Sequence, residues 1–201
     1  MINQKNNLFH FDCSFAQPIA GVDEVGRGPL AGPVVAAAVI IDINNIPNGI
    51  NDSKKLSKKN RLKISDEIKE SSVYSIAKAS VKEIEEINIL QASLLAMKRA
   101  IEGLSKEPTT VLVDGKFKPK TNFLTHSVIK GDAQSLSIAA SSIIAKVYRD
   151  KLMSDLSKKY PEYLWEKNAG YGTKEHLLAI KKCGITPIHR KSFKPIHNML
   201  N

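Results

Sequence analysis

The strongest constraint on the fold is a run of eight apolar residues, Val34 to Ile41, in a chain of 201 residues. The run is too short to cross a bilayer, and Pro29 and Pro33 precede it, so it predicts a buried strand. Ile19 to Val25 predicts another strand shortly before it. Because few residues separate the two strands and several of them are glycine or proline, we expect an antiparallel, hairpin-like pair.

Helices and further strands are predicted after this pair. Ser57 precedes a polar helix that runs to about Glu70, and Val73 to Ala79 is typical of a third strand. Ser80 and Glu83 have the spacing of a capping box, which places a helix start there. The next helix carries an apolar stripe that we interpret as core, made of Ile87, Leu90, Leu94, Met97, Ile101 and Leu104.

The second half of the chain follows the same pattern. Thr110 to Val113 predicts a short strand and Ser127 to Ile129 the last one. Gly131-Asp132 then opens a helix that runs to about Lys159, and a shorter helix is expected near Thr173 to Lys182. This order of elements predicts a mixed sheet covered by helices, an α/β layer fold.

Composition indicates a basic protein. The formal net charge is +10 and the isoelectric point about 9.5, which suits a protein that binds a polyanion. The excess of lysine over arginine leaves open that the charge reflects a biased genome. Cys13 and Cys183 match no metal-binding spacing, and the N-terminus has no apolar segment of signal-peptide length. We therefore expect reduced thiols and a cytoplasmic protein without a membrane segment.

Four acidic residues lie at the ends of predicted apolar strands or at a helix start. Asp23 and Glu24 lie within the first strand, Asp114 ends the Thr110 to Val113 segment, and Asp132 follows Gly131. A carboxylate in such a place is costly unless it is paired or binds a cation. Converging carboxylates bind hard cations, so Mg²⁺ is the expected ion and Mn²⁺ a substitute. Two such ions can clamp a phosphodiester and activate water.

Simpler explanations exist for two of these acids. Asp132 has the character of a helix N-cap, and Asp114 before Gly115 that of a turn residue. Asp23 and Glu24 have no such explanation, but consecutive strand residues point to opposite faces. The pair can share one site if the strand bends after them, or if Glu24 also uses its backbone carbonyl.

A glycine loop follows the paired acids directly. Gly26, Gly28 and Gly32 do not have the GxGxxG spacing of a dinucleotide-binding loop, and a strand rather than a helix comes next. Glycine instead allows the backbone to approach a ligand closely. Lys54 and the adjacent Lys55 precede a helix, where either phosphate contact or a solvated lysine cluster is consistent with the sequence.

Seven motifs follow one another along the chain: GVDEVGRGPLAGPVV (21–35), NDSKKL (51–56), VDG (113–115), KGD (130–132), ASSIIAKVYRD (140–150), GYGTKEH (170–176) and PIHRKSF (187–193). In this order, over residues 19–197, they resemble the ribonuclease HII family. The chain departs from the family in having Asn168-Ala169 before Gly170-Tyr171. The related type HIII carries an N-terminal substrate-binding domain and usually Glu at the fourth acidic position; the short segment before Asp23 and the presence of Asp132 favour type HII.

The resemblance implies a ribonuclease H-like fold, a five-stranded mixed sheet flanked by helices with a helical C-terminal segment. We expect residues 1–18 to be an N-terminal extension and 19–201 a single catalytic domain. The resemblance also implies site residues: Asp23, Glu24, Asp114 and Asp132 as the catalytic, metal-binding set, Gly26, Arg27 and Gly28 as readers of the ribose 2′-hydroxyl, and Tyr171 stacked on the following sugar.

The implied activity is cleavage of RNA in RNA/DNA hybrids and 5′ of single ribonucleotides in duplex DNA. The products are a 3′-hydroxyl and a 5′-phosphate, and the enzyme is expected to act as a monomer. The alternatives are a catalytically inactive nucleic-acid-binding module on the same fold and another metal nuclease, such as a junction resolvase. Roles for Lys146, Asp150, His189 and Arg190 stay open, and Trp165 is expected to be a packing residue.

Overall fold

The computed structural model describes residues 4–51 and 53–200, so Asp52 of the NDSKKL motif lies outside the described residues. Its five strands are β1 (Ile19–Val25), β2 (Val34–Ile41), β3 (Ser72–Ala79), β4 (Thr110–Asp114) and β5 (Leu124–Val128). The helices are α1 (Gln4–Cys13), α2 (Lys58–Ser71), α3 (Val81–Glu102), η1 (Gly131–Ala133), α4 (Leu136–Lys159), η2 (Pro161–Tyr163), α5 (Trp165–Asn168), α6 (Lys174–Cys183) and α7 (Lys194–Leu200).

The strands form one mixed sheet in the order β3-β2-β1-β4-β5. β1 pairs antiparallel with β2, as the short connection predicted, and β2 pairs antiparallel with β3. β4 joins β1 in parallel, and β5 joins β4 in parallel. The central position of β1 and β2 explains why both are nearly continuous apolar runs. The predicted five-stranded mixed sheet is thereby confirmed.

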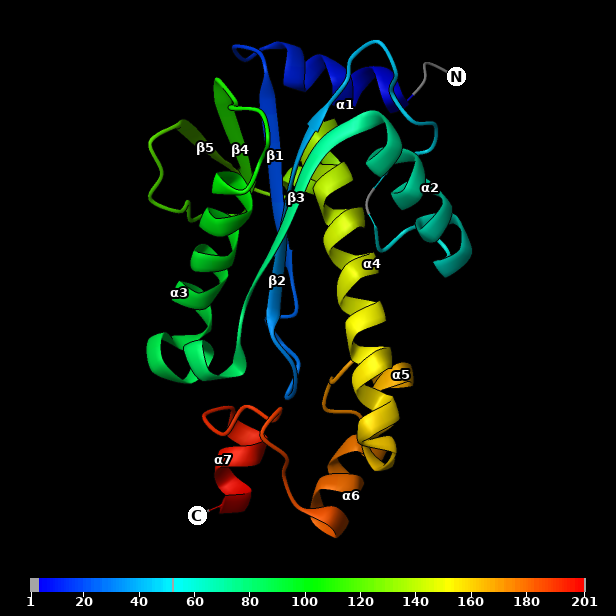
Figure 1. The fold of residues 1–201 in the computed structure, drawn as a ribbon, viewed down its shortest axis with the longest axis vertical. Helices are drawn as coiled ribbons and strands as arrows, with labels where there is room; N and C mark the ends of the chain where they lie inside the picture. The colour runs from blue at the N-terminus through cyan, green and yellow to red at the C-terminus, as the bar shows by residue number, and fades with distance from the viewer. Residues whose placement is uncertain (1–3, 52, 201) are drawn as a thin grey trace.

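Two long helices cover the two faces of the sheet. Side chains of β1 such as Ala20 and Val22 pack with Met97 and Ile101 of α3, whereas Val35 and other β2 residues pack with α4. α4 continues beyond the sheet, where its last turns pack with η2, α5 and α6 (Figure 1). The C-terminal segment therefore lies at the end of the sheet where β1 ends, and α1 lies at the opposite end (Figure 1).

The apolar stripe of α3 was only partly predicted. Met97 and Ile101 are buried, but Ile87 is 37% exposed. The cause is a kink at Asn88, whose backbone has a φ of 66° and whose side chain accepts hydrogen bonds from the amides of Leu90 and Gln91. Asn88 thus caps the second part of the helix and turns Ile87 away from the core.

Two other element boundaries differ from those predicted. The long helix does not begin at Gly131-Asp132, because these residues form η1, and Ser135 is the N-cap that accepts a hydrogen bond from the amide of Ile138. Asp132 is therefore not the N-cap. The last strand is Leu124–Val128 rather than Ser127 to Ile129. The capping box of Ser80 and Glu83 is present as predicted.

The N-terminal segment contains a helix that the sequence patterns did not predict. Leu8 of α1 is buried in the cluster that includes Leu136 and Ala140 of α4. The carboxylate of Asp12 accepts a hydrogen bond of 2.9 Å from the backbone amide of Ser137, in the first turn of α4. A negative charge at the N-terminus of a helix interacts favourably with the helix dipole. No helix of the described residues is long and apolar enough to cross a membrane.

Gly21 sets how closely α4 approaches β1. A Cβ atom at this position would overlap the backbone of Ser137 and Ile138, so any larger residue would push the helix off the sheet. We expect Gly21→Ala to lower the free energy of unfolding by about 3 kcal/mol, the upper range for overpacking a core. Gly28→Ala is the matched control, since its Cβ would find the nearest atom at 3.6 Å. Equal melting temperatures for the two variants would contradict this interpretation.

Candidate active site

The sheet places Asp23 and Asp114 beside each other. β1 and β4 are parallel, with Val22 paired to Val113, and the two aspartates follow these residues at the same edge of the sheet. Asp23 is 7% exposed and Asp114 is partly buried. Two strands that each supply a carboxylate at matching register account for the strand-end acids that the sequence shows.

The side chain of Glu24 points to the face of the sheet opposite to that of Asp23. Residues alternate between faces along a strand, so Glu24 shares the α3 side with Val22, whereas Asp23 faces α4 and interacts with the hydroxyl of Ser142. Arg27 donates to the Glu24 carboxylate at 3.3 Å. The geometric difficulty expected for two consecutive acids is therefore real: their side chains start in opposite directions.

Asp132 reaches the site from η1, which follows β5. The backbone amide of Gly131 donates to the Asp114 carboxylate at 2.6 Å, and this bond holds the KGD segment against the end of β4. Lys54 approaches from the segment before α2, with its Nζ 3.7 Å from a carboxylate oxygen of Asp132. All four predicted acids and Lys54 thus belong to one region, formed by β1, β4, η1 and the loop before α2.

Burial and mutual repulsion raise the pKa values of three carboxyl groups of this region, those of Asp23, Glu24 and Asp114. For Asp23 burial is the largest cause, followed by the charges of Glu24 and Asp114, and its pKa lies well above the usual range. Burial also raises the pKa of Glu24, which Arg27 partly offsets. Burial raises the pKa of Asp114 against the hydrogen bond from Gly131, and the charge of Asp132 raises it further. The charged forms of these three groups are therefore disfavoured, because too few positive charges lie near them to offset burial and repulsion.

The donor set fits a hard divalent cation in its chemistry. All four groups offer carboxylate oxygens, and a bound cation would relieve the cost of burying like charges. As the side chains stand, no three Asp, Glu, His or Cys groups of the described residues are close enough together to hold an ion. A cation would have to draw the carboxylates together, or use a backbone oxygen for one of them.

Ser142 was not recognised in the sequence as a site residue. It lies on α4, is buried, and shares a hydrogen bond of 2.9 Å between its hydroxyl and that of Ser53. The same hydroxyl interacts with Asp23. Ser142 therefore connects the buried acid to the loop that carries Lys54. The signal available was a pair of serines, Ser141 and Ser142, between apolar residues of α4.

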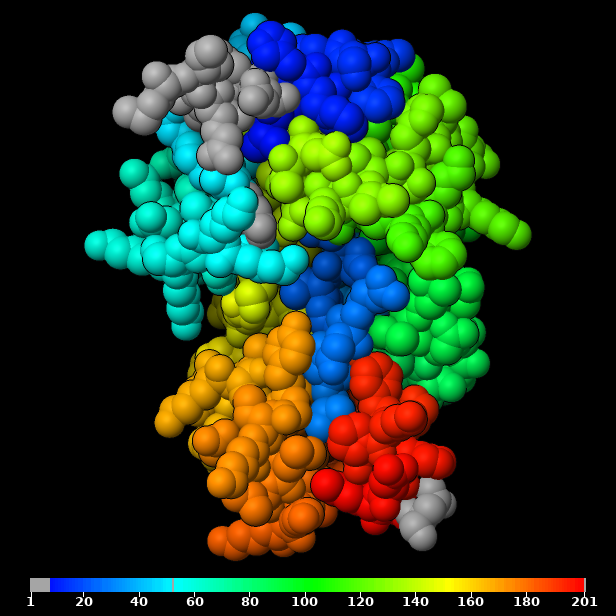
Figure 2. Space-filling model, turned by 180° about the vertical axis from the view of Figure 1, so that it is seen from behind, coloured from blue at the N-terminus to red at the C-terminus, as the bar shows by residue number. Residues whose placement is uncertain are grey.

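The glycine loop lies in a hollow of the surface. Figure 2 shows the blue segment after β1 framed by the cyan segment before α2, the yellow-green segment near β5 and the orange segment before α6. Gly26 has a φ of +97°, and a Cβ there would overlap the side chain of Arg149, so this glycine is required by the protein itself. Gly28 has no such constraint, and its nearest neighbour is the ring of Tyr171.

Tyr171 lies beside the glycine loop with 45% of its surface exposed. Its backbone carbonyl is 2.8 Å from Nδ1 of His176, and Nε2 of His176 lies 3.0 Å from the indole nitrogen of Trp165 and 3.1 Å from Nε2 of His189. The indole can only donate, so Nε2 of His176 accepts and Nδ1 donates to Tyr171. The amide of Thr186 donates to Nδ1 of His189, which leaves the proton on Nε2 of that ring.

Burial and contacts assign roles to residues whose roles the sequence left open. His189 and Arg190 are 1% and 0% exposed, so both are interior residues rather than surface contacts for nucleic acid. Trp165 is fully buried, which confirms its packing role. Lys146 and Asp150 form the expected pair along α4 at 2.7 Å, and Arg61 of α2 also approaches Asp150 at 3.6 Å.

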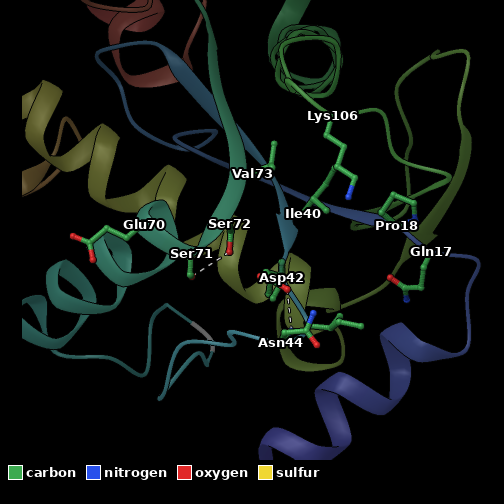
Figure 3. Close-up of a pocket in the computed structure, with 12 residues that line it drawn as sticks. Gln17, Pro18, Ile40, Asp42, Asn44, Glu70, Ser71, Ser72, Val73 and Lys106 are labelled. Atoms are coloured by element: carbon green, nitrogen blue, oxygen red, sulfur yellow. Dashed lines mark hydrogen bonds between the residues drawn. The ribbon is translucent and has the colours of Figure 1, made fainter.

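A pocket lies elsewhere on the protein, and none of the four acids lines it. Figure 3 shows this cavity of about 700 Å³, which is lined by Gln17, Pro18, Ile40–Asn44, Glu70–Val73 and Lys106. Pro18 precedes β1 and Ile41 ends β2, so the pocket lies at the opposite end of β1 from Asp23 and the glycine loop. Its position separates it from the chemistry proposed below.

Comparisons with known proteins agree on one family. The family model for ribonuclease HII matches residues 20–196. A ribonuclease HII from Roseobacter denitrificans is 54% identical over 186 residues, covering 92% of this chain and 94% of the relative. The crystal structure of the ribonuclease H2 from Pyrococcus horikoshii is similar at 28% identity, with a TM-score of 0.76 over 90% of this chain and 96% of that one. Bst-RNase HIII in complex with Mn²⁺ shares the fold at 19% identity, with a TM-score of 0.71 over 98% of this chain and 71% of that one.

The histidine pair predicts an acid-sensitive C-terminal segment. Burial, with a contribution from His176, lowers the pKa of His189 to about 4. Below about pH 6.5 His189 therefore binds a proton in the unfolded chain but not in the folded protein. The free energy of unfolding falls by up to about 3 kcal/mol as the pH approaches 4. We expect urea denaturation to show a smaller loss over this window for His189→Asn than for the wild type. Equal losses would contradict the assigned neutral pair.

Proposed function

The chain belongs to the ribonuclease HII family, whose members are endoribonucleases, and we propose that it cuts on the 5′ side of a ribonucleotide in a duplex whose other strand is DNA. Its substrates would be RNA/DNA hybrids and duplex DNA with single embedded ribonucleotides, and its products a 3′-hydroxyl and a 5′-phosphate. The observation that carries this proposal is the juxtaposition of buried carboxylates with a glycine loop and an exposed tyrosine.

Asp23, Glu24, Asp114 and Asp132 would hold the divalent metal, either Mg²⁺ or Mn²⁺. Support comes from the raised pKa values of Asp23, Glu24 and Asp114 and from the all-oxygen donor set of the four residues. When bound, a pair of such ions would supply Lewis-acid activation of water and stabilisation of the leaving oxygen. The protein contributes hydrogen bonds that favour the charged forms of two of these groups, from Ser142 to Asp23 and from the amide of Gly131 to Asp114.

Residues of the glycine loop would read the ribose. The 2′-hydroxyl is the feature that distinguishes RNA from DNA at a given site, and its reader must approach it closely. Within the described residues the amides of Arg27 and Gly28 donate no backbone hydrogen bond, so both can serve a ligand. The Arg27 side chain is half exposed next to Glu24, where it can bind the neighbouring phosphate. Lys54, beside Asp132, would bind a second phosphate.

Tyr171 would lie against the sugar that follows the ribonucleotide. A Cβ built on Gly28 would come within 3.6 Å of the Tyr171 ring, so the glycine loop and the tyrosine face one substrate position. An additional hydroxyl on the following sugar would crowd the ring. The expected preference is therefore a ribonucleotide followed by a deoxyribonucleotide.

A catalytically inactive binding module on the same fold is the main alternative from another class. Such a module would have no use for carboxylates buried next to one another, because they destabilise the protein without an ion. A metal nuclease with another substrate is the second alternative, and the exposed tyrosine beside a glycine loop argues against it. We further propose that residues 19–201 act as a single catalytic domain, with 1–18 as an extension, and that the protein works as a monomer.

The test is cleavage of an end-labelled DNA duplex that contains one ribonucleotide, in the presence of Mg²⁺ or Mn²⁺. We expect one cut, 5′ of the ribonucleotide, and none in the all-DNA duplex. Asp114→Asn keeps an acceptor for the amide of Gly131 but removes a charge, so cleavage should fall by about a thousandfold or more while the protein stays folded. Asp66→Asn, on the exposed side of α2, is the matched control. Wild-type turnover by the Asp114 variant would remove this residue from the mechanism.

Gly28→Ala tests how the substrate is read. A Cβ at Gly28 meets only ordinary van der Waals contact with Tyr171, so the free protein should keep its melting temperature. We expect cleavage to fall at least about tenfold, because the methyl group occupies space that the sugar needs. Tyr171→Ala should reduce cleavage most on a single embedded ribonucleotide and least on a long hybrid.

The competing explanation is that the glycines merely form a turn and that Tyr171 packs in its loop. A Gly28→Ala variant of normal stability that cleaves the single-ribonucleotide duplex at the wild-type rate would establish that explanation.

A further inference from the structure

Among the described residues, two arginines are fully buried and form no ion pair with a carboxylate. Arg149 of α4 and Arg190 of the PIHRKSF segment are both 0% exposed. The arginines that form ion pairs among the described residues are Arg27, Arg61 and Arg99. A buried guanidinium is costly unless its donors are satisfied, so the groups that satisfy them are informative.

Arg190 donates to the carbonyls of the glycine loop. Its Nη2 lies 2.6 Å from the carbonyl of Gly26, its Nη1 2.9 Å from that of Arg27, and its Nε 2.9 Å from that of Gly32. The segment that carries Arg190 is fixed in turn, because the Arg190 amide donates to the carbonyl of Leu30. One side chain thus holds both ends of the loop between β1 and β2.

Arg149 holds the same loop from the other side and connects it to Tyr171. Its Nη2 donates to the carbonyl of Ala31 at 3.0 Å and its Nε to that of Pro33 at 3.1 Å. Its Nη1 donates to the carbonyl of Ala169 at 2.9 Å, two residues before Tyr171. Burial lowers the pKa of Arg149 to about 10 and that of Arg190 to about 9, so both remain charged at neutral pH.

The carbonyls that Arg190 binds determine where the loop amides point. In a trans peptide the N–H lies opposite the C=O. Since the carbonyls of Gly26 and Arg27 turn inward to the guanidinium, the amides of Arg27 and Gly28 turn away from it. These are the two amides that would meet the ribose. A lysine could not replace this arrangement, because an ammonium group lacks the planar fork of five donors.

We propose that Arg190 is a positioning residue that aims the Arg27 and Gly28 amides at the ribose 2′-hydroxyl, and that Arg149 sets the spacing between this loop and Tyr171. The inference rests on the proposed function, because it assigns a cause to the ribose reading proposed above. Neither arginine touches the substrate. Their effect is on the geometry of the backbone donors, and so on discrimination between ribose and deoxyribose.

The test compares binding of two duplexes, one all DNA and one with a single ribonucleotide, with Ca²⁺ in place of Mg²⁺. The quantity measured is the dissociation constant of the all-DNA duplex divided by that of the ribonucleotide duplex. We expect Arg190→Lys to lower this ratio by about tenfold, the effect of losing one well-placed hydrogen bond, with affinity for the all-DNA duplex unchanged. Arg99→Lys is the control, since Arg99 also donates to a backbone carbonyl but lies on α3. Measurements below the melting temperature of each variant separate the effect from unfolding.

The outcomes distinguish the two proposals. If the wild type itself does not discriminate, the proposed function fails. If the wild type discriminates between the duplexes and Arg190→Lys discriminates equally well, the positioning role is wrong. It is also wrong if Arg190→Lys loses affinity for both duplexes by the same factor. Should Arg190→Lys not fold, hydrogen exchange of the wild type decides: the ribonucleotide duplex must protect the amides of residues 27 and 28 more than the all-DNA duplex does, and equal protection overturns the proposal.

Discussion

The burial of several like charges at the end of β1 and β4 is the constraint on which the rest of this structure depends. Asp23, Glu24 and Asp114 raise one another's pKa values or have them raised by burial, and the chain offsets this cost only in part. Ser142, the amide of Gly131 and Arg27 each favour a charged form. A folded protein gains no stability from such a cluster, so its presence indicates a ligand of opposite charge.

Holding the cluster requires a rigid frame. Parallel pairing of β1 with β4 sets Asp23 beside Asp114, and the absence of a side chain at Gly21 lets α4 approach closely enough to bring Ser142 to Asp23. The C-terminal segment completes the frame from below in Figure 1. Its buried His176 binds the backbone carbonyl of Tyr171, and its buried Arg190 binds the carbonyls of Gly26 and Arg27. These contacts join distant parts of the chain around one surface hollow.

The sequence allowed four of the five strands, the bounds of α2 and α6 and the start of α3 to be predicted, because those features are local. That the four acids form one metal site is implied by the resemblance and stays a prediction. An apolar run of eight residues, a capping box at Ser80 and acids inside an apolar strand are visible without tertiary structure. The kink at Asn88 could not be predicted from the apolar pattern. At this position the Asn88 side chain accepts hydrogen bonds from the next amides of α3, and the backbone leaves the regular helical conformation. The interior roles of Arg149 and Arg190 also escaped prediction, because most of their partners are backbone carbonyls more than 100 residues away, and a backbone carbonyl does not depend on residue type.

Proton release on metal binding tests the central claim most directly. If a divalent cation supplies the charge that the buried acids lack, its binding must displace protons from groups whose pKa values are raised. Titration calorimetry of the protein with Mn²⁺, in two buffers of different ionisation enthalpy between about pH 5 and pH 8, gives the number of protons released. The account predicts a release that declines as the pH rises and that decreases in Asp23→Asn. Binding heats that are the same in both buffers at every pH would contradict it.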